Sequence, residues 1–147
     1  MKIISKTLIT VIALAAASVA FAEGEAADPQ VKAREDLMKS IAGNTKVLAD
    51  LAGGKVAFDA DAASQAKEAL VVDSGKIAEA FKDPATDPVS EAKPEIWTSW
   101  DDFVAKAGAL NAAAMAIDVS SAETIGAGMG AIGGACKDCH TSYRAMN

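Results

Sequence analysis

The sequence is poor in positive charge, in cysteine and histidine, and in aromatic side chains. Its 14 lysines and arginines are outnumbered by 20 aspartates and glutamates, which gives a formal net charge of −6. A nucleic acid is therefore not an expected partner, because its phosphates attract cationic surfaces. Aromatic residues make up only 5% of this alanine-rich chain, so a core built from its own side chains would be modest. No segment alternates β-branched and polar residues for long enough to predict a strand.

The first segment of the chain lacks the length to span a membrane. Two lysines precede an uncharged apolar run over residues 7–19, and Ala20-Phe21-Ala22 places small residues two positions apart. A membrane anchor needs about 20 apolar residues, whereas this pattern is typical of a signal peptide cleaved after Ala22. We therefore expect a leader over residues 1–22 and one periplasmic domain over residues 23–147. Loss of the two leader lysines changes the formal net charge from −6 to −8.

Four later segments repeat apolar residues at the three- and four-residue steps of an α-helix. They run from Asp28 to Leu51, from about Asp61 to Phe81, from Pro94 to Ile117, and from a Ser120–Glu123 capping box to Tyr143. Between the second and third lies Lys82–Pro94, which holds three of the four prolines and predicts a long crossover loop. The expected fold is all-α, an antiparallel up-down-up-down four-helix bundle.

Both cysteines and the single histidine lie within the five residues CKDCH, as Cys136, Cys139 and His140. Three kinds of site use these residue types: a redox disulfide, a zinc site and covalently attached haem. A redox Cys-x-x-Cys normally begins a helix that follows a strand, whereas this pair lies near the end of the last predicted helix. Structural zinc needs four ligands, and the fourth would have to be a carboxylate such as Asp138, on the other side of the helix.

The Cys-x-x-Cys-His spacing is the one that attaches haem in c-type proteins. Cys136 and Cys139 are three positions apart, and His140 is four positions after Cys136, so all three share one helical face. Two thiols can then bond the porphyrin vinyl groups while the imidazole reaches the iron. A bundle that encloses one covalently bound haem would also bury the large apolar surface of the porphyrin.

Five glycines occur within the nine residues GAGMGAIGG, residues 126–134, inside the fourth predicted helix. Each interior glycine costs a helix up to about 1 kcal/mol relative to alanine. One interpretation is a frayed or kinked helix. The interpretation we favour is that the backbone lies close to a flat, bulky group that a side chain would strike.

These features together resemble the cytochrome c′ family, which includes low-spin proteins of the cytochrome c-556 kind. The resemblance is carried by AREDLMK in the first helix, KPEIW at the start of the third, and CKDCHTSYR near the C-terminus. It covers essentially the whole predicted mature chain. The family resemblance implies that Cys136 and Cys139 form the thioethers to haem c, that His140 is the proximal axial ligand of the iron, and that Arg144 lies on the proximal side.

The resemblance also assigns residues of the first helix. It implies that Arg34 lies near a haem propionate with Glu35 beside it, and that Met38 faces the iron from the distal side. The alternatives are a solvated surface charge for Arg34 and an ordinary core side chain for Met38. Because Arg34 and Met38 share the inward stripe, where an unpaired arginine would be costly, we favour functional roles.

The resemblance implies two possible functions, which differ in what Met38 does. If Met38 binds the iron, the protein is a one-electron carrier for a redox protein partner, since a His/Met pair suits electron transfer. If Met38 only lines the distal site, a five-coordinate iron binds nitric oxide or carbon monoxide. We expect the electron carrier, which is not an enzyme. Homodimer formation through the first two helices is implied by the resemblance as well, and Trp97 and Trp100 are interpreted as packing residues.

Overall fold

The computed structural model describes residues 24–145, so the predicted leader, residues 1–22, lies outside the described residues. The described chain forms six helices: α1 (Pro29–Ala52), α2 (Ala60–Ser74), α3 (Ile77–Ala80), α4 (Glu95–Thr98), α5 (Trp100–Ala116) and α6 (Ala122–Tyr143). Across residues 24–145 there is no strand, only an isolated antiparallel bridge between Ala92 and Arg144. The all-α prediction is confirmed.

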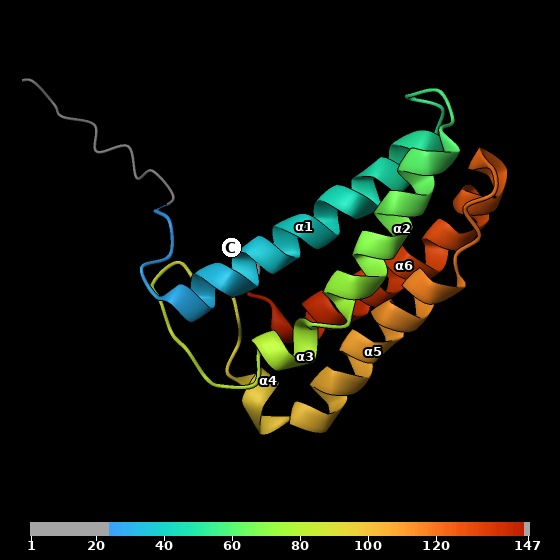
Figure 1. Ribbon diagram of the computed structural model, residues 1–147. Helices are drawn as coiled ribbons and strands as arrows, with labels where there is room; N and C mark the ends of the chain where they lie inside the picture. The colour runs from blue at the N-terminus through green and yellow to red at the C-terminus, as the bar shows by residue number, and fades with distance from the viewer. Residues whose placement is uncertain (1–23, 146–147) are drawn as a thin grey trace, which may run out of the picture.

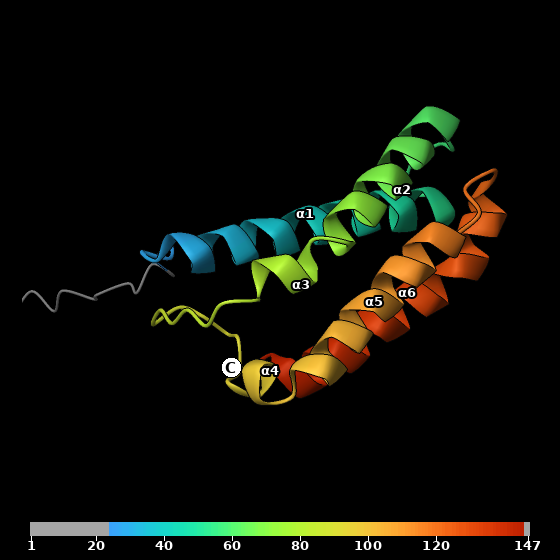
Figure 2. The same ribbon diagram turned by 60° about the horizontal axis from the view of Figure 1, so that its bottom comes forward.

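The four long helices form a closed ring. In this ring α1 packs against α2 and α6, and α5 packs against α2 and α6, which is the arrangement of a four-helix bundle (Figure 1). Figure 2 shows α1 with α2 and α5 with α6 as two pairs, which lie close at the end of the α1–α2 and α5–α6 turns and spread toward the end that carries α3 and α4. The predicted bundle is therefore confirmed. No helix within the described range is long and apolar enough to cross a bilayer.

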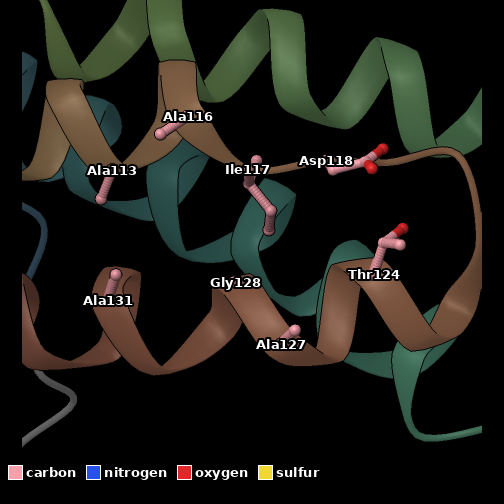
Figure 3. Close-up of a pocket in the computed structure, with 8 residues that line it drawn as sticks. All are labelled: Ala113, Ala116, Ile117, Asp118, Thr124, Ala127, Gly128 and Ala131. Carbon is pink, nitrogen blue, oxygen red and sulfur yellow. The ribbon is translucent and has the colours of Figure 1, made fainter.

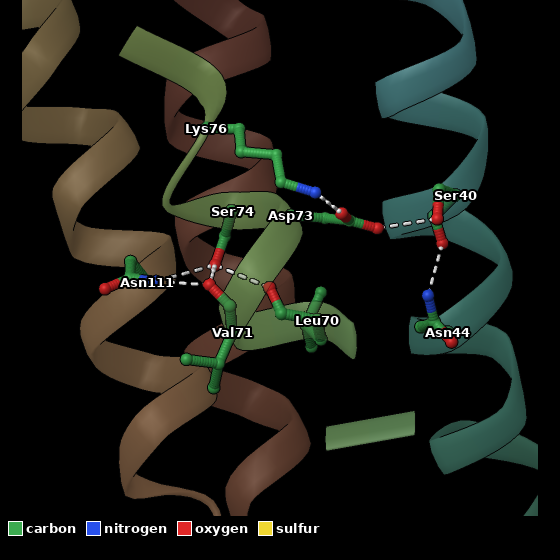
Figure 4. Close-up of polar contacts among 8 residues, drawn as sticks. All are labelled: Ser40, Asn44, Leu70, Val71, Asp73, Ser74, Lys76 and Asn111. Atoms are coloured by element: carbon green, nitrogen blue, oxygen red, sulfur yellow. Dashed lines mark hydrogen bonds and ion pairs between the residues drawn. The ribbon is translucent and has the colours of Figure 1, made fainter. Parts of the chain in front are cut away.

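The second predicted helix is not continuous, because α2 ends at Ser74 and α3 begins at Ile77. The buried Ser74 hydroxyl donates to the carbonyl of Leu70 over 2.6 Å. Asn111 of α5 donates its amide to the Ser74 hydroxyl over 3.0 Å and to the Val71 carbonyl over 2.8 Å (Figure 4). The side chains of Ser74 and Asn111 thus bind backbone carbonyls in the last turn of α2, and Gly75 follows as the C-cap. The apolar periodicity of the sequence did not predict these hydrogen bonds from α5.

The end of α2 is also tied to α1. The carboxylate of Asp73 accepts a hydrogen bond from the Ser40 hydroxyl over 2.6 Å and from the Lys76 ammonium over 2.9 Å (Figure 4). Both hydrogen bonds lower the pKa of Asp73 below its usual value. The chain direction therefore changes at a point that α1 and α5 both hold.

The third predicted helix is interrupted at Ser99, whose φ of −126° and ψ of 45° are not helical. α4 starts directly after Pro94, as expected, but it lasts only four residues before α5 begins. The bend lets the two tryptophans pack in different places. Trp97 donates its indole N–H to the carbonyl of Phe81 over 2.8 Å, whereas Trp100 stacks on Phe103.

The capping box of α6 is shifted by one residue from the prediction. Ser121, not Ser120, has the extended backbone of an N-cap, and its hydroxyl accepts from the N–H of Thr124 over 3.1 Å. The hydroxyl of Thr124 accepts in return from the N–H of Ser121. The predicted Ser120–Glu123 pair was wrong because Ser120 and Ser121 are both suitable N-cap residues, and the sequence does not show which of them caps the helix.

The glycine-rich segment forms an uninterrupted part of α6, so the helix is not broken there. A Cβ atom on Gly128 would lie 2.6 Å from Cγ1 of Ile117, whose side chain points across a shallow groove of about 290 Å³ between α5 and α6 (Figure 3). Close approach is therefore real at Gly128, but the neighbour is an aliphatic side chain and not a flat group. At Gly130, Gly133 and Gly134 an added Cβ would meet no described atom within 4 Å.

Candidate haem-binding site

The CKDCH residues occupy the last two turns of α6. Cys136, Cys139 and His140 are each half-buried, and both cysteines are free thiols. Cys136 and Cys139 pack against the hydrophobic core of the bundle. The helical spacing thus places two thiols and one imidazole on a sheltered face, and this set of groups suits attachment of a haem by two sulfurs and one nitrogen.

The protonation of these groups follows from their burial. Desolvation raises the pKa of both Cys136 and Cys139, which is the opposite of the shift that activates the thiolate of a dithiol oxidoreductase. Desolvation, and then the charge of Arg144, lower the pKa of His140, while Glu91 opposes this shift. The imidazole is therefore neutral near pH 7, the state in which its nitrogen binds a metal.

The zinc interpretation lacks a fourth ligand in the structure. Residues 24–145 contain no group of three or more His, Cys, Asp or Glu side chains arranged to hold a metal ion. Asp138, the carboxylate that the sequence offered, instead pairs with Lys106 of α5 over 2.5 Å. The donor set on α6 therefore fits haem attachment and does not fit a structural zinc site.

Arg34 of α1 is buried, with 3% of its surface exposed, and it does not lie on the solvated surface. Its guanidinium donates hydrogen bonds to the backbone carbonyls of Ala80, Asp83 and Ala85. It also lies 4.9 Å from the ring centre of Phe81 and 5.4 Å from that of Trp97. These carbonyls and rings offset the cost of burying the charge. The propionate role of Arg34 stays a prediction.

Met38 and Glu35 lie on the same part of α1. Met38 is half-buried and packs against the core, which fits either a distal ligand or a core side chain. The carboxylate of Glu35 lies 3.5 Å from the ammonium of Lys39 in an exposed ion pair. The predicted roles of Met38 and Glu35 beside the haem remain predictions.

The crossover segment, residues 82–94, is bonded at its end to the C-terminus of α6. Arg144 places its Nε 2.5 Å from the carboxylate of Glu91, and the N–H of Lys93 donates to the carbonyl of Tyr143 over 3.0 Å. The N–H of Ala145 donates to the Glu91 carbonyl over 2.8 Å. Arg144 is therefore held one turn beyond His140, and its predicted place on the proximal side stays a prediction.

The same segment is bonded to α1 at its beginning and middle. The carbonyls of Asp83 and Ala85 receive the Arg34 hydrogen bonds, and the carboxylate of Asp87 accepts from the N–H groups of Ala27 and Asp28, each over 2.9 Å. The crossover thus connects the start of α1 with the end of α6, the two helices that carry the predicted site residues. Its prolines indicated a loop, but nothing in the sequence indicated these partners.

An aromatic cluster fills this end of the bundle. The ring of Phe103 lies 5.3 Å from Phe81, 5.5 Å from Trp100 and 5.4 Å from Tyr143, measured between ring centres. Trp97 and Trp100 both pack against the core, so their interpretation as packing residues is confirmed. The cluster connects α3 and α5 to Tyr143, three residues after His140.

Two residues of α5 that contact α6 were missed by sequence reasoning. The hydroxyl of Tyr143 donates to the carboxylate of Asp102 over 2.6 Å, and Lys106 forms the ion pair with Asp138. A signal for them did exist, because Lys106 is the only charged residue between Phe103 and Ala116 and follows Asp102 by one helical turn. A single charge within a long uncharged stretch of helix favours a specific partner.

Comparison with known proteins agrees with this geometry. A family model described as Cytochrome C′ matches residues 29–144. Cytochrome c-556 from Agrobacterium tumefaciens (strain II Chrys) is 34% identical over 118 residues, which cover 78% of this chain and 96% of that protein.

Solved structures give the same result. Cytochrome c′ from Rhodobacter Spheriodes superposes with a TM-score of 0.74 at 29% identity, covering 80% of this chain and 96% of that chain. A nitric oxide complex of a cytochrome c prime mutant from Alcaligenes xylosoxidans gives a TM-score of 0.71 at 26% identity, covering 80% and 94%. The helical bundle, the CKDCH motif and these matches over most of the chain lead to one conclusion: the chain belongs to the cytochrome c′ family.

Proposed function

We propose that residues 23–147 form a periplasmic monohaem c-type cytochrome that carries single electrons for a redox protein partner and turns over no substrate. The observation that carries this proposal is the set of two free, half-buried thiols and one neutral imidazole on a single face of α6. Family membership implies covalently bound haem c with its iron as the cofactor. The expected leader over residues 1–22 supports export to the periplasm.

Different residues would hold different parts of this cofactor. Cys136 and Cys139 would provide the sulfurs of two thioethers, and His140 would provide the proximal nitrogen. When bound, the haem iron supplies one-electron chemistry between its ferric and ferrous states. Arg34 keeps a positive charge inside the bundle at the start of the crossover, where it favours a nearby anionic group such as a propionate.

Met38 separates electron transfer from gas binding. A thioether ligand suits both oxidation states, so an iron held by His140 and Met38 changes its charge without gaining or losing a ligand. The second candidate function is binding of nitric oxide or carbon monoxide at a distal site that Met38 lines without ligating. The observation that favours it is the nitric oxide complex of the Alcaligenes relative.

The visible absorption spectrum of the reduced protein tests both functions. The protein is expressed with a cytochrome maturation system, and its mass is compared with the sum of the mature chain and one haem. A sharp α band that carbon monoxide leaves unchanged is expected for the electron carrier. A broad high-spin spectrum that changes with carbon monoxide supports gas binding, and a mass without haem contradicts the whole proposal.

Substitution of the distal methionine gives a matched test. Met38→Ala is expected to convert a low-spin spectrum into a high-spin one, because the iron loses its sixth ligand. Met115→Ala is the control, since Met115 is 55% exposed on α5. An unchanged spectrum in the Met38 variant removes this residue as a ligand.

The proposal includes a homodimer formed through α1 and α2, as the resemblance implies. A groove of about 420 Å³ between these helices is lined by uncharged residues only, and Val47, one of these residues, is 40% exposed. Uncharged surface supports contact between two copies of an acidic protein. Sedimentation of Val47→Asp is expected to give a monomer where the parent gives a dimer, and a monomeric parent contradicts this part of the proposal.

A further inference from the structure

The end of α6 is held by α5 at two positions, one on each side of the ligand pair in sequence. Lys106 binds Asp138 over 2.5 Å, and Asp102 accepts from the hydroxyl of Tyr143 over 2.6 Å. Cys139 and His140 lie between these two attachment positions. Asp102 and Lys106 are themselves one turn apart on α5, so they reach α6 from the same face.

In the attachment through Tyr143, the tyrosine is sheltered from water while Asp102 lies at an exposed position of α5. Tyr143 has 6% of its surface exposed, and its ring meets that of Phe103 at 86° with 5.4 Å between centres. The ring is therefore fixed by Phe103 and the hydroxyl by Asp102. In the second attachment the Lys106 side chain is 20% exposed and Asp138 is 65% exposed, so this bond is weaker.

The attachment of α6 to the crossover is less sheltered. The side chains of Arg144 and Glu91 are 49% and 38% exposed, so water screens their ion pair. Rotation of α6 about its axis would separate Tyr143 from Phe103 and Asp102, whereas an exposed arginine can follow such a motion with its long side chain. The two backbone hydrogen bonds of the crossover hold the last residue of α6 and the chain after it, whereas the α5 contacts hold side chains that project from the helix itself.

The His140 ring has no such support of its own. No side chain or carbonyl of residues 24–145 is hydrogen-bonded to its imidazole. Metal-binding histidines usually have their second ring nitrogen oriented by a hydrogen bond. Among the described residues, the orientation of this imidazole therefore depends on how the α6 backbone is held.

We propose that Asp102 and Lys106 are positioning residues that fix the rotation of α6 and thereby the direction in which His140 presents its imidazole to the haem iron. They act through Tyr143 and Asp138, with Asp102 the more important of the two. This inference rests on the proposed haem function. The tests therefore use the haem-loaded protein and read the orientation of the axial ligand.

The main test compares Asp102→Ala with Asp101→Ala, which removes the same charge from the neighbouring exposed position of α5. Both variants are expected to contain one haem by mass. The ferric electron paramagnetic resonance g-values, which report the orientation of axial ligands, are expected to shift and broaden in Asp102→Ala and to stay at the parent values in Asp101→Ala. Equal spectra in the two variants overturn the inference.

Two further variants separate orientation from charge and from general instability. Asp102→Asn keeps an acceptor for the Tyr143 hydroxyl without the charge, so it is expected to restore the parent g-values. Tyr143→Phe is expected to give a shift at least as large as Asp102→Ala, because it also removes the longer bond from the hydroxyl to the Ser99 carbonyl over 3.4 Å, and the double variant no larger shift than Tyr143→Phe. Additive shifts, or no restoration by asparagine, contradict the proposal.

A second pair of variants covers the case in which Asp102→Ala does not accumulate. Lys106→Met is expected to shift the g-values away from those of the parent, and Lys106→Arg to leave them unchanged. Parent spectra in Lys106→Met remove Lys106 from the inference. A parent protein without haem overturns the proposed function as well, whereas a haem-loaded parent whose variants all match it overturns only the positioning role.

Discussion

The two ends of the bundle are built in different ways. At the end that carries α3, α4 and the CKDCH turn, helices are joined by an aromatic cluster and by the buried Arg34. At the opposite end they meet through small side chains, with Gly128 under Ile117 and Gly126 near Ala52. Phe58, in the loop at that opposite end, remains 40% exposed.

Conformational specificity is concentrated at the end that carries the CKDCH turn. Small residues let helices approach closely, but their surfaces are alike and fix a rotation or register only weakly. Large rings and directional hydrogen bonds have few alternative arrangements. The chain therefore places five of its seven aromatic residues and its buried Arg34 at the end of the bundle that must present two sulfurs and a nitrogen in fixed positions.

Removal of Arg34 is expected to have the largest effect at the site end. Arg34→Met keeps much of the side-chain volume but leaves three carbonyls of the crossover without their donor, so the free energy of unfolding should fall by about 3 kcal/mol. Lys39→Met, at an exposed position of the same helix, should change it by less than about 0.5 kcal/mol. Urea unfolding measures both, and similar midpoints in the two variants would show that the buried charge does not organise this end.

A pair of glycine variants tests the opposite end. Gly128→Ala should lower the free energy of unfolding by about 1 kcal/mol, because a Cβ forced against the buried Ile117 costs more than helix propensity returns. Gly130→Ala, where an added Cβ meets no described atom within 4 Å, should raise it by about 0.5 kcal/mol. Thermal and urea unfolding provide the measurements. Equal effects of the two substitutions would mean that the close approach at Gly128 is not specific.

Tyr143 gives the site end a dependence on alkaline pH. Its hydrogen bond to Asp102 is the first cause that raises the pKa of Tyr143 to about 12, above its ordinary value of 10.0. The unfolded chain therefore loses this proton first, so the stabilisation is complete below pH 10 and disappears as the pH rises to about 12. Urea midpoints over this range should fall less steeply for Tyr143→Phe than for the parent. Parallel slopes would contradict the assignment.

Asp87 should give the smallest effect, on the acid side. Hydrogen bonds from the N–H groups of Asp28, Val89 and Ala27 help keep the pKa of Asp87 below its ordinary value of 3.8. Its contribution is present above that value and is lost as the pH falls through the lowered pKa. Asp87→Asn should therefore unfold with a shallower acid dependence than the parent, as followed by circular dichroism. Glu68→Gln, on the exposed part of α2, is the control.

Patterns that repeat within a few residues could be predicted from the sequence. The start of α1 at Asp28-Pro29, the inward stripe through Val31, Arg34 and Ile41, and the common face of the CKDCH residues all depend on the helical period. The capping box was misplaced by one residue because neighbouring serines compete for the same role. The break at Gly75 was missed because Asn111 lies on α5, and the break at Ser99 because the hydrogen-bond partner of Trp97, the carbonyl of Phe81, lies at the end of α3.

The chemistry of the candidate site follows from local sequence, since the period of 3.6 residues per turn puts Cys136, Cys139 and His140 on one face wherever that helix forms. The surroundings of these residues follow from the packing of the helices. The partners of Arg34 lie 46 to 51 residues further along the chain, and those of Asp138 and Tyr143 are 32 and 41 residues away on α5. Such contacts depend on how four helices pack together, and no local pattern contains that information.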